Sequence, residues 1–324
     1  MRSIIISIAG VSSALVQLAQ ASAVAQEFPD RPVTIINQTA AGSGPDVVSR
    51  IVGEHLTRMW GHQVVTLNRP GASGLIAARA AASATPDGYT LYMPTSTALV
   101  VLPETNSKMP IDFARDFIPI GMVGETPMAI AVSTKLGFAS LSELIEAAKV
   151  SPQPLLYAAN NRGSIPHLAG AYLSKKANIS LTFVPHTGAA SALSNVLSDS
   201  VPIIVESLSA LTGTAEGGSI KLLAVTSSSR LGQFPDIPTV AESIPGFLVT
   251  GWFALLAPAG TPDAVVRKIA GDLRTVLSAP ELQIRFEALG VYPRIASPSD
   301  TAAFIRSERE VWRPIIKDAG LATP

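Results

Sequence analysis

The stretch Asn68-Arg69-Pro70-Gly71-Ala72-Ser73-Gly74, followed by Pro86-Asp87-Gly88-Tyr89-Thr90-Leu91, carries most of the information about the fold of this chain. Its Gly and Ala residues let the backbone come close to a ligand, and exposed backbone N–H groups in such a loop can hold an anion. Residues 63–67 and 90–93 have the composition of buried strands, and the Ala-rich segment 75–83 between them is typical of a helix. This order of strand, Gly-rich loop, helix and strand predicts a parallel sheet covered by helices.

The same alternation extends along the rest of the chain. Residues 33–36 are predicted to form a strand, and Pro45 begins a helix, a position where its missing N–H costs nothing. Further predicted strands are 128–132, 155–158, 181–184, 202–205, 221–226 and 252–257, and further predicted helices are 140–149, 261–276 and 300–318. The chain is therefore expected to be an α/β protein with helices on both faces of a largely parallel sheet.

The domain organisation follows from length and from the absence of a linker. A chain of this size favours about two domains, yet no Pro/Gly/Ser tract divides it. The stretches 118–124 and 245–251 resemble points where the chain crosses between domains. We therefore expect a discontinuous first lobe, residues 26–124 plus 249–324, and a second lobe, residues 125–248. Clefts between such lobes are favoured binding sites, and hinge closure is their usual motion.

The N-terminal segment has the pattern of an export signal. Arg2 precedes an apolar stretch, 4–18, which is followed by small residues up to Ala25. Residues 1–25 are thus predicted to be a signal peptide, cleaved after Ala25 or after Ala23. A retained membrane anchor is the alternative, but the apolar stretch is short for a bilayer span. Because the chain has no cysteine, a lipid-modified N-terminal Cys is excluded, and a freely diffusing periplasmic protein is expected.

Composition excludes several classes of function. Lys and Arg number 24 and Asp and Glu number 24, so no excess charge favours nucleic acid or an anionic membrane. Zero cysteines exclude a disulfide framework, a thiol nucleophile and a thiolate metal site. The four histidines show no metal-ligand spacing; they are His55, His62, His167 and His186. Gly42-Ser43-Gly44 resembles the start of a dinucleotide fingerprint, but Pro45 interrupts it and Val47 replaces its third Gly. We expect neither metal nor cofactor.

A series of short motifs runs through nearly the whole chain after residue 25. They are the loop 40–46 with the helix after it, the two segments quoted above, and the segments 116–119, 157–170, 184–188, 223–230, 234–242 and 252–262. In this order and spacing they resemble the Bug/TctC family, the extracytoplasmic solute receptors of tripartite tricarboxylate transporters. The resemblance implies a type II periplasmic-binding-protein fold, with two α/β lobes joined by two crossing strands and the ligand cleft between them. It also implies a small organic carboxylate as ligand and the membrane subunits of such a transporter as partners.

The candidate ligand-binding residues come from both predicted lobes. In the first lobe they are Ala40, Ala41, Gly42, Ser43, Gly44, Asp46, Gly71, Ala72, Ser73, Gly74 and Ser96. In the second lobe they are Asn161, Gly163, Ser164, Thr187 and Glu206. A carboxylate at a helix N-terminus meets unpaired N–H groups and the positive end of the helix dipole, so such a site needs no Arg.

Several of these residues have a purely structural alternative. Asp46 either faces the ligand or complements the charge of the first helical turn. Ser164 is an N-cap, a ligand contact or both. Glu206 either accepts a hydrogen bond from a ligand hydroxyl or amine, or is a strand-end carboxylate. His167 has no Gly-x-Ser-x-Gly elbow around it, which favours a structural histidine over a general base. Asn68 is expected to brace the Gly-rich loop.

Departures from the family pattern bear on the ligand. Gln38-Thr39 stands where Pro-Phe is common, Ala41 where Gly is common, Leu99 where His is frequent, and His186-Thr187 where Tyr-Lys is frequent. These changes predict a pocket with fewer charges than a tricarboxylate needs.

The expected function is a monomeric, non-catalytic periplasmic receptor that delivers a carboxylate to a membrane transporter. The main alternative is an exported hydrolase or isomerase acting in the same cleft, with His167 paired to Ser164 or Glu206. Two further alternatives are a receptor that feeds a sensor protein and a scaffold of the cell envelope, which would have no cleft.

Overall fold

The structure is a computed structural model that describes residues 28–322 of the chain, so the predicted signal peptide lies outside the described residues. Its strands form one continuous sheet with the order β2-β1-β3-β9-β4-β7-β5-β6, while β8 and β10 pair with β4. The strands are β1 (Val33–Asn37), β2 (Val64–Asn68), β3 (Thr90–Met93), β4 (Phe117–Ser133), β5 (Leu155–Asn160), β6 (Leu181–His186), β7 (Ile203–Ser207), β8 (Ile220–Val225), β9 (Thr250–Pro258) and β10 (Tyr292–Pro293).

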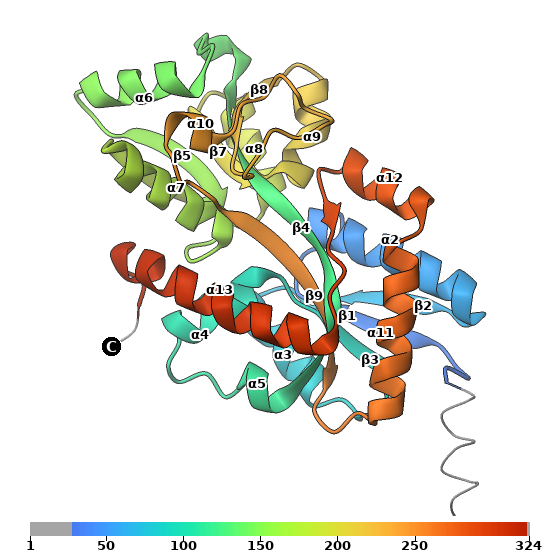
Figure 1. Cartoon of the computed structure of the whole chain (residues 1–324). Helices are drawn as coiled ribbons and strands as arrows, with labels where there is room; N and C mark the ends of the chain where they lie inside the picture. The colour runs from blue at the N-terminus through green and yellow to red at the C-terminus, as the bar shows by residue number, and fades with distance from the viewer. Residues whose placement is uncertain (1–27, 323–324) are drawn as a thin grey trace, which may run out of the picture.

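Two long strands join two α/β lobes. In Figure 1, β4 and β9 run diagonally through the middle of the molecule, with β1–β3 at one end and β5–β8 at the other. Each lobe contains a parallel unit, because β1 pairs in parallel with β2 and β3, and β5 pairs in parallel with β6 and β7. We call the end with β1–β3 the first lobe and the end with β5–β8 the second lobe.

The expectation of a largely parallel sheet is wrong for the centre of the molecule. β4 runs antiparallel to β7, β8, β9 and β10. A strand that leads from one lobe to the other and a strand that returns must run in opposite directions, so the central pair cannot be parallel. The predicted crossing stretch 118–124 and the predicted strand 128–132 are consequently parts of one strand, Phe117–Ser133. Pro127 lies within this strand.

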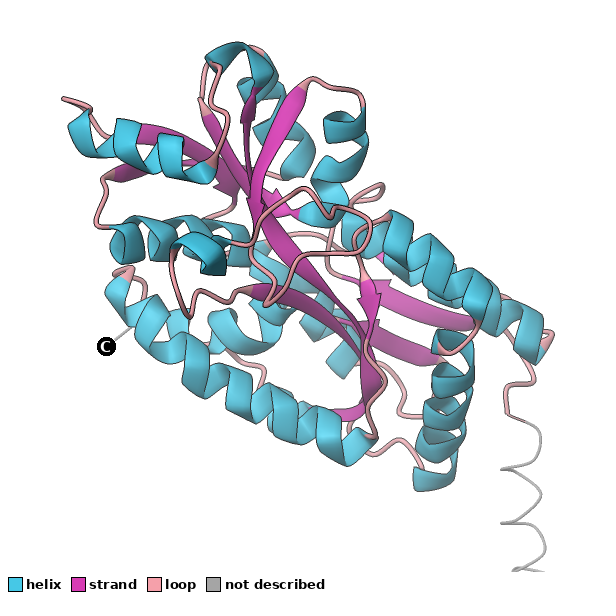
Figure 2. Ribbon diagram, turned by 45° about the horizontal axis from the view of Figure 1, so that its top comes forward, coloured by secondary structure: helices cyan, strands magenta, loops and turns pink. Residues whose placement is uncertain are grey.

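The helices cover both faces of the sheet, as Figure 2 shows. They are α2 (Gly44–Trp60), α3 (Leu75–Ala82), α4 (Leu102–Thr105), α5 (Phe113–Asp116), α6 (Leu141–Val150), α7 (Ile165–Ala177), α8 (Ala189–Leu197), α9 (Leu208–Glu216), α10 (Val240–Ser243), α11 (Asp263–Leu277), α12 (Pro280–Ala288) and α13 (Pro298–Asp318), with short η1 (Ala72–Gly74), η2 (Thr97–Val101) and η3 (Thr134–Leu136). None of the helices among residues 28–322 is long and apolar enough to cross a bilayer.

Local sequence explains where the helix after β1 begins and ends. Val48, Ile51, Val52 and Leu56 recur at helical spacing and are buried against the sheet. Pro45 sits in the first turn, and Gly61 ends the helix in the left-handed conformation, with its N–H bonded to the Thr57 carbonyl. Helix α2 therefore begins close to the point where β1 ends, as expected for a strand–loop–helix unit.

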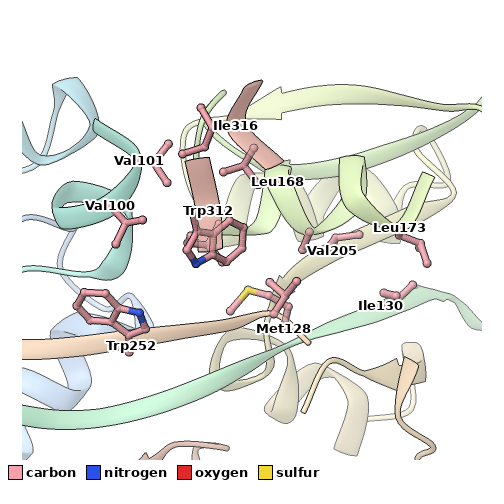
Figure 3. Close-up of a cluster of buried hydrophobic side chains, with 14 of the residues drawn as sticks. Val100, Val101, Met128, Ile130, Leu168, Leu173, Val205, Trp252, Trp312 and Ile316 are labelled. Carbon is pink, nitrogen blue, oxygen red and sulfur yellow. The ribbon is translucent and has the colours of Figure 1, made fainter. Parts of the chain in front are cut away.

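The last long helix packs beside the crossing strands and ties the two lobes together. Trp312 and Ile316 of α13 lie in one apolar cluster with Val100 of the first lobe and Leu168 of α7, as Figure 3 shows. Trp252 of β9 belongs to the same cluster, and its Nε1 donates to Glu308 of α13 at 2.9 Å. The two lobes thus share a core on the side where α13 packs.

Candidate ligand-binding cleft

A cleft of about 740 Å³ lies between the two lobes. Its walls come from the loops that follow β1, β2 and β3 in the first lobe and from the loops that follow β5, β6 and β7 in the second. Loops after the carboxyl ends of parallel strands are the usual ligand sites of α/β sheets. The fold therefore brings segments far apart in sequence around one cavity.

Helix N-termini surround this cleft. Residues at the starts of five helices, α2, α3, α7, α8 and α9, contribute to its wall: Gly44, Gly74, Ile165, Ala189 and Ser207. The first turn of a helix has N–H groups without intrahelical partners, and the helix dipole places partial positive charge there. The backbone at these helix starts can therefore offer N–H donors to an anion.

The Gly-rich loop after β2 has an unusual backbone. Gly71, Ala72, Ser73 and Gly74 have φ values of 124°, 48°, 55° and 100°. Positive φ costs free energy at Ala72 and Ser73, and such strain is found most often at binding sites. An added Cβ at Gly71 would lie 2.6 Å from Ile76 Cδ1, and one at Gly74 would lie 2.8 Å from Gln38 Oε1. The positive φ values therefore favour glycine at both positions, and Gly74 is also closely packed against Gln38.

Gln38 holds the first-lobe wall together. Its Nε2 donates to Thr95 Oγ1 at 2.9 Å, and its Oε1 accepts from the Tyr92 hydroxyl at 3.1 Å. Gln38 and Thr95 both line the cleft. The polar residue that departs from the family pattern thus connects the loop after β1 to the loop after β3.

The cleft wall is nearly free of ionisable groups. Among the described residues that form it, none is Lys, Arg or His, and Glu206 is the one residue that can carry a charge. Burial raises the pKa of Glu206 to about 7, an effect that hydrogen bonding from Ser207 partly offsets. The expectation of few charges agrees with this lining.

Eleven of the predicted site residues line the cleft: Ala40, Ser43, Gly44, Gly71, Ala72, Ser73, Gly74, Ser96, Asn161, Thr187 and Glu206. Five others lie outside its wall: Ala41, Gly42, Asp46, Gly163 and Ser164. Ser164 caps α7, accepting a hydrogen bond from the His167 backbone N–H at 3.3 Å. Gly163 donates its N–H to His167 Nδ1 at 3.1 Å. The Ser164–His167 pair therefore supports the start of α7 from behind the cleft wall.

His167 is buried among apolar groups. Its exposed fraction is 4%, and its ring lies 4.0 Å from the ring of Phe183. Burial, with help from the charge of Arg162, lowers the pKa of His167 to about 4. A neutral imidazole that accepts a hydrogen bond from backbone and does not line the cleft fits a structural role.

Asp46 supports the loop after β1 from within. Its carboxylate accepts hydrogen bonds from Gly42 N–H at 2.8 Å, Arg50 Nε at 3.0 Å and Asn68 Nδ2 at 2.8 Å. Burial acts to raise its pKa, but these three donors together hold the pKa below its usual value. Asn68 also donates to the Thr39 carbonyl at 3.0 Å. One carboxylate thus connects the loops after β1 and β2.

Replacing Asp46 with alanine is expected to lower the free energy of unfolding by about 2 kcal/mol at pH 7, because a buried carboxylate that accepts three hydrogen bonds, one of them from the charged Arg50, is lost. A depressed carboxyl pKa stabilises the fold above the unfolded-state pKa, 3.8, and this contribution disappears as the pH falls through the folded-state value. The difference from wild type should therefore shrink near pH 3. Urea unfolding at both pH values measures it, with exposed Asp236→Ala as the control. An equal loss at pH 3 would contradict this role.

Several wall residues were not predicted from sequence. They include Thr95, Thr97, Thr126, Met128, Asn160, Trp252 and Phe253. Thr126, Met128, Trp252 and Phe253 belong to the crossing strands β4 and β9, which line the floor of the cleft. These residues directly follow the predicted crossing stretches 118–124 and 245–251, and strands that connect two lobes can form the floor of the cleft between them. Within residues 28–322, no three His, Cys, Asp or Glu residues come close enough to hold a metal ion.

Comparison with known sequences gives one consistent result. Residues 48–321 match the family described as "Tripartite tricarboxylate transporter family receptor". A UPF0065 protein of Bordetella bronchiseptica is 34% identical over 307 residues, which cover 95% of this chain and 91% of that protein. Protein BugT of Bordetella pertussis is 31% identical over 298 residues, 91% of each chain.

Solved structures show the same fold. Rpa4515 of R. palustris, solved with adipate, has a TM-score of 0.87 and 29% identity, and the match covers 91% of this chain and 99% of that one. The periplasmic binding protein BugD has a TM-score of 0.84 and 30% identity, and the match covers 92% of this chain and 100% of BugD. MatC from Rhodopseudomonas palustris, with bound malate, has a TM-score of 0.80 and 26% identity, and the match covers 89% of this chain and 100% of MatC. The two-lobed architecture described above is thus that of periplasmic binding proteins.

Proposed function

The chain belongs to the tripartite tricarboxylate transporter receptor family, TctC, and on that premise we propose that it is a periplasmic receptor for a small organic carboxylate. It binds the carboxylate in the cleft between its lobes and delivers it to the membrane subunits of a transporter of this kind. Solved relatives that bind adipate and malate support a dicarboxylate as ligand. Binding acts by shifting the lobes towards the closed arrangement rather than by catalysis.

One observation carries this proposal. Five helices begin at the cleft wall, while no basic side chain among the described residues lines it. An anion is the ligand that such a backbone lining favours, and waters can complete its hydrogen bonds at little cost. A ligand held by backbone groups also leaves readily when the lobes open, which suits a delivery protein.

The lobe boundaries are part of the same proposal. We assign residues 26–124 and 249–324 to the first lobe and residues 125–248 to the second. β4 pairs with β9 up to Pro127 and Thr250, and from Met128 onwards it pairs with β7 and β8 of the second lobe. We also propose that the protein is exported to the periplasm, that its signal peptide is cleaved near Ala25, and that it is a monomer.

A thermal unfolding screen tests the function. The purified protein, freed of carried-over ligand by partial unfolding and refolding, is measured with adipate, malate, citrate, glutamate and an aromatic acid. A ligand at about 100 times its Kd should add about 2.7 kcal/mol to the free energy of unfolding, a shift of several degrees. Adipamide, which keeps the shape of adipate without its charges, is the matched control.

The same samples separate a receptor from an enzyme. A receptor returns its ligand unchanged, so mass spectrometry after prolonged incubation should recover each carboxylate intact. Conversion of a ligand would support the exported enzyme instead. Equal shifts with adipate and adipamide would count against recognition of the carboxylate.

A further inference from the structure

One wall of the cleft contains two buried oxygen atoms without a partner. Glu206, at the carboxyl end of β7, is 2% exposed; its Oε1 accepts from the Ser207 N–H at 2.8 Å, and its Oε2 has no hydrogen-bond partner. Asn160 Oδ1, at the end of β5, is also unpartnered. β5 and β7 pair in parallel with Ala158 opposite Ile204, and continuing this register places Asn160 beside Glu206. Both residues line the cleft, so a ligand can supply the missing partners.

No positive charge is available among the described residues to compensate an ionised Glu206. The elements packed against β7 are β4, β5, α7, α8 and α9. Their titratable groups have contacts elsewhere or are exposed. Glu125 pairs with Arg294, and Lys175 pairs with Asp318. Tyr157 donates to the His167 carbonyl, and His167 accepts from Gly163. Tyr172 packs on Phe247, Lys176 lies over Tyr172, and Glu216 is exposed. Burial is accordingly the main cause of the raised Glu206 pKa, and no charged side chain contributes to it.

A carboxylate ligand would therefore share a cation-free cavity with a second carboxyl group. Two negative charges in such a site are strongly unfavourable, and the acid with the higher pKa keeps its proton. A protonated Glu206 removes the repulsion and turns Oε2 from an unpaired acceptor into a donor.

We infer that the receptor takes up its carboxylate together with one proton, which resides on Glu206 and is donated from Oε2 to a ligand oxygen. The proton comes from solvent on binding and returns to solvent on release, so ligand affinity depends on pH. This inference rests on the proposed function, and it specifies that Glu206 is protonated when the carboxylate is bound.

The pH dependence follows from linkage. In the empty protein, Glu206 is increasingly ionised above pH 7, and only the protonated form binds. If the bound form stays protonated, affinity should fall about 25-fold between pH 6.5 and pH 8.5. Glu206→Gln carries a permanent donor, Nε2, in place of the titrating hydroxyl, so its affinity should be nearly constant over this range. Glu216→Gln is the matched control, because Glu216 lies at the far end of α9 and does not line the cleft.

Titration calorimetry with adipate and with malate at pH 6.5, 7.5 and 8.5 tests the inference, since both probes are almost fully ionised across this range. Repeating the pH 8 titration in phosphate and in Tris measures proton uptake, because the buffers differ in ionisation enthalpy. We expect close to one proton per ligand for wild type and Glu216→Gln and none for Glu206→Gln.

Each other outcome has a definite meaning. Binding without proton uptake, or binding that tightens as the pH rises, overturns the inference while leaving the receptor function intact. Loss of binding in folded Glu206→Gln at every pH also overturns it, because Glu206 would then accept from a ligand donor such as an ammonium group. If wild type binds neither these probes nor citrate or glutamate at any pH, the proposed function itself fails, and the inference fails with it.

Discussion

Ionisation of Glu206 should lower the free energy of unfolding of the wild-type protein by about 3 kcal/mol between pH 4.5 and pH 8, and the Glu206→Gln variant should not show this loss. The folded-state pKa of Glu206 is raised from 4.5 to about 7 by burial, so the fold prefers the protonated acid. Stability associated with this preference is fully present below pH 4.5 and is lost as the pH rises through 7. The shift of about 2.5 units corresponds to about 3 kcal/mol.

Other carboxyl groups also titrate in this range, so the quantity to measure is the difference between wild type and variant. Chemical unfolding of Glu206→Gln, Glu216→Gln and wild type is compared at pH 5, 6, 7 and 8 without ligand. The curves for wild type and Glu216→Gln should run in parallel, while Glu206→Gln gains on both as the pH rises. If its difference from wild type stays constant, Glu206 is ionised throughout, and the assignment of a protonated acid is wrong.

The local elements around the cleft follow closely from sequence. β3 occupies Thr90–Met93, as its apolar run predicts, and the segment after Gly74 forms the Ala-rich helix Leu75–Ala82. These assignments succeed because Gly, Pro and strings of small residues determine backbone conformation locally. Membership of the receptor family is also confirmed, since it rests on motifs spread over the whole chain.

The chemical state of the site required the three-dimensional structure. Sequence left Glu206 as either a ligand contact or a strand-end carboxylate, because burial depends on β4 and β5 packing beside β7. It also left Asp46 as either a ligand contact or a residue that complements the charge of the first helical turn. Only the folded structure shows that the Asp46 carboxylate is occupied by Gly42, Arg50 and Asn68. Interactions between distant segments decide both cases.

The structure also changes which glycine is informative. Gly71 attracts attention in the sequence, but its positive φ and the contact with Ile76 mean that any side chain there would disturb the loop itself. Gly44, in contrast, has no positive φ, and an added Cβ would meet Ser209 of the other lobe. A substitution at Gly44 therefore tests how the lobes approach each other.

Changing Gly44 to valine is expected to weaken carboxylate binding about 5- to 150-fold with little loss of stability. An added Cβ would lie 2.6 Å from Ser209 Oγ and 3.4 Å from Ser209 Cβ, so the methyl groups of valine must push the lobes apart or enter the cleft. Overpacking of this kind costs about 1–3 kcal/mol. Because the clash exists only where the lobes meet, it reduces the population of the binding-competent form and the apparent affinity by the same factor.

Calorimetry with the best carboxylate from the screen measures this loss, and small-angle scattering reports whether the lobes open. Gly213→Val on α9 is the control, because a Cβ there meets nothing within 4 Å. A Gly44→Ala, Ser209→Gly double variant restores space at the contact and should bind nearly as well as wild type. If Gly44→Val keeps full affinity, Gly44 and Ser209 do not meet in the ligand-bound state. The lobes would then have to close along a different path from the one this contact implies.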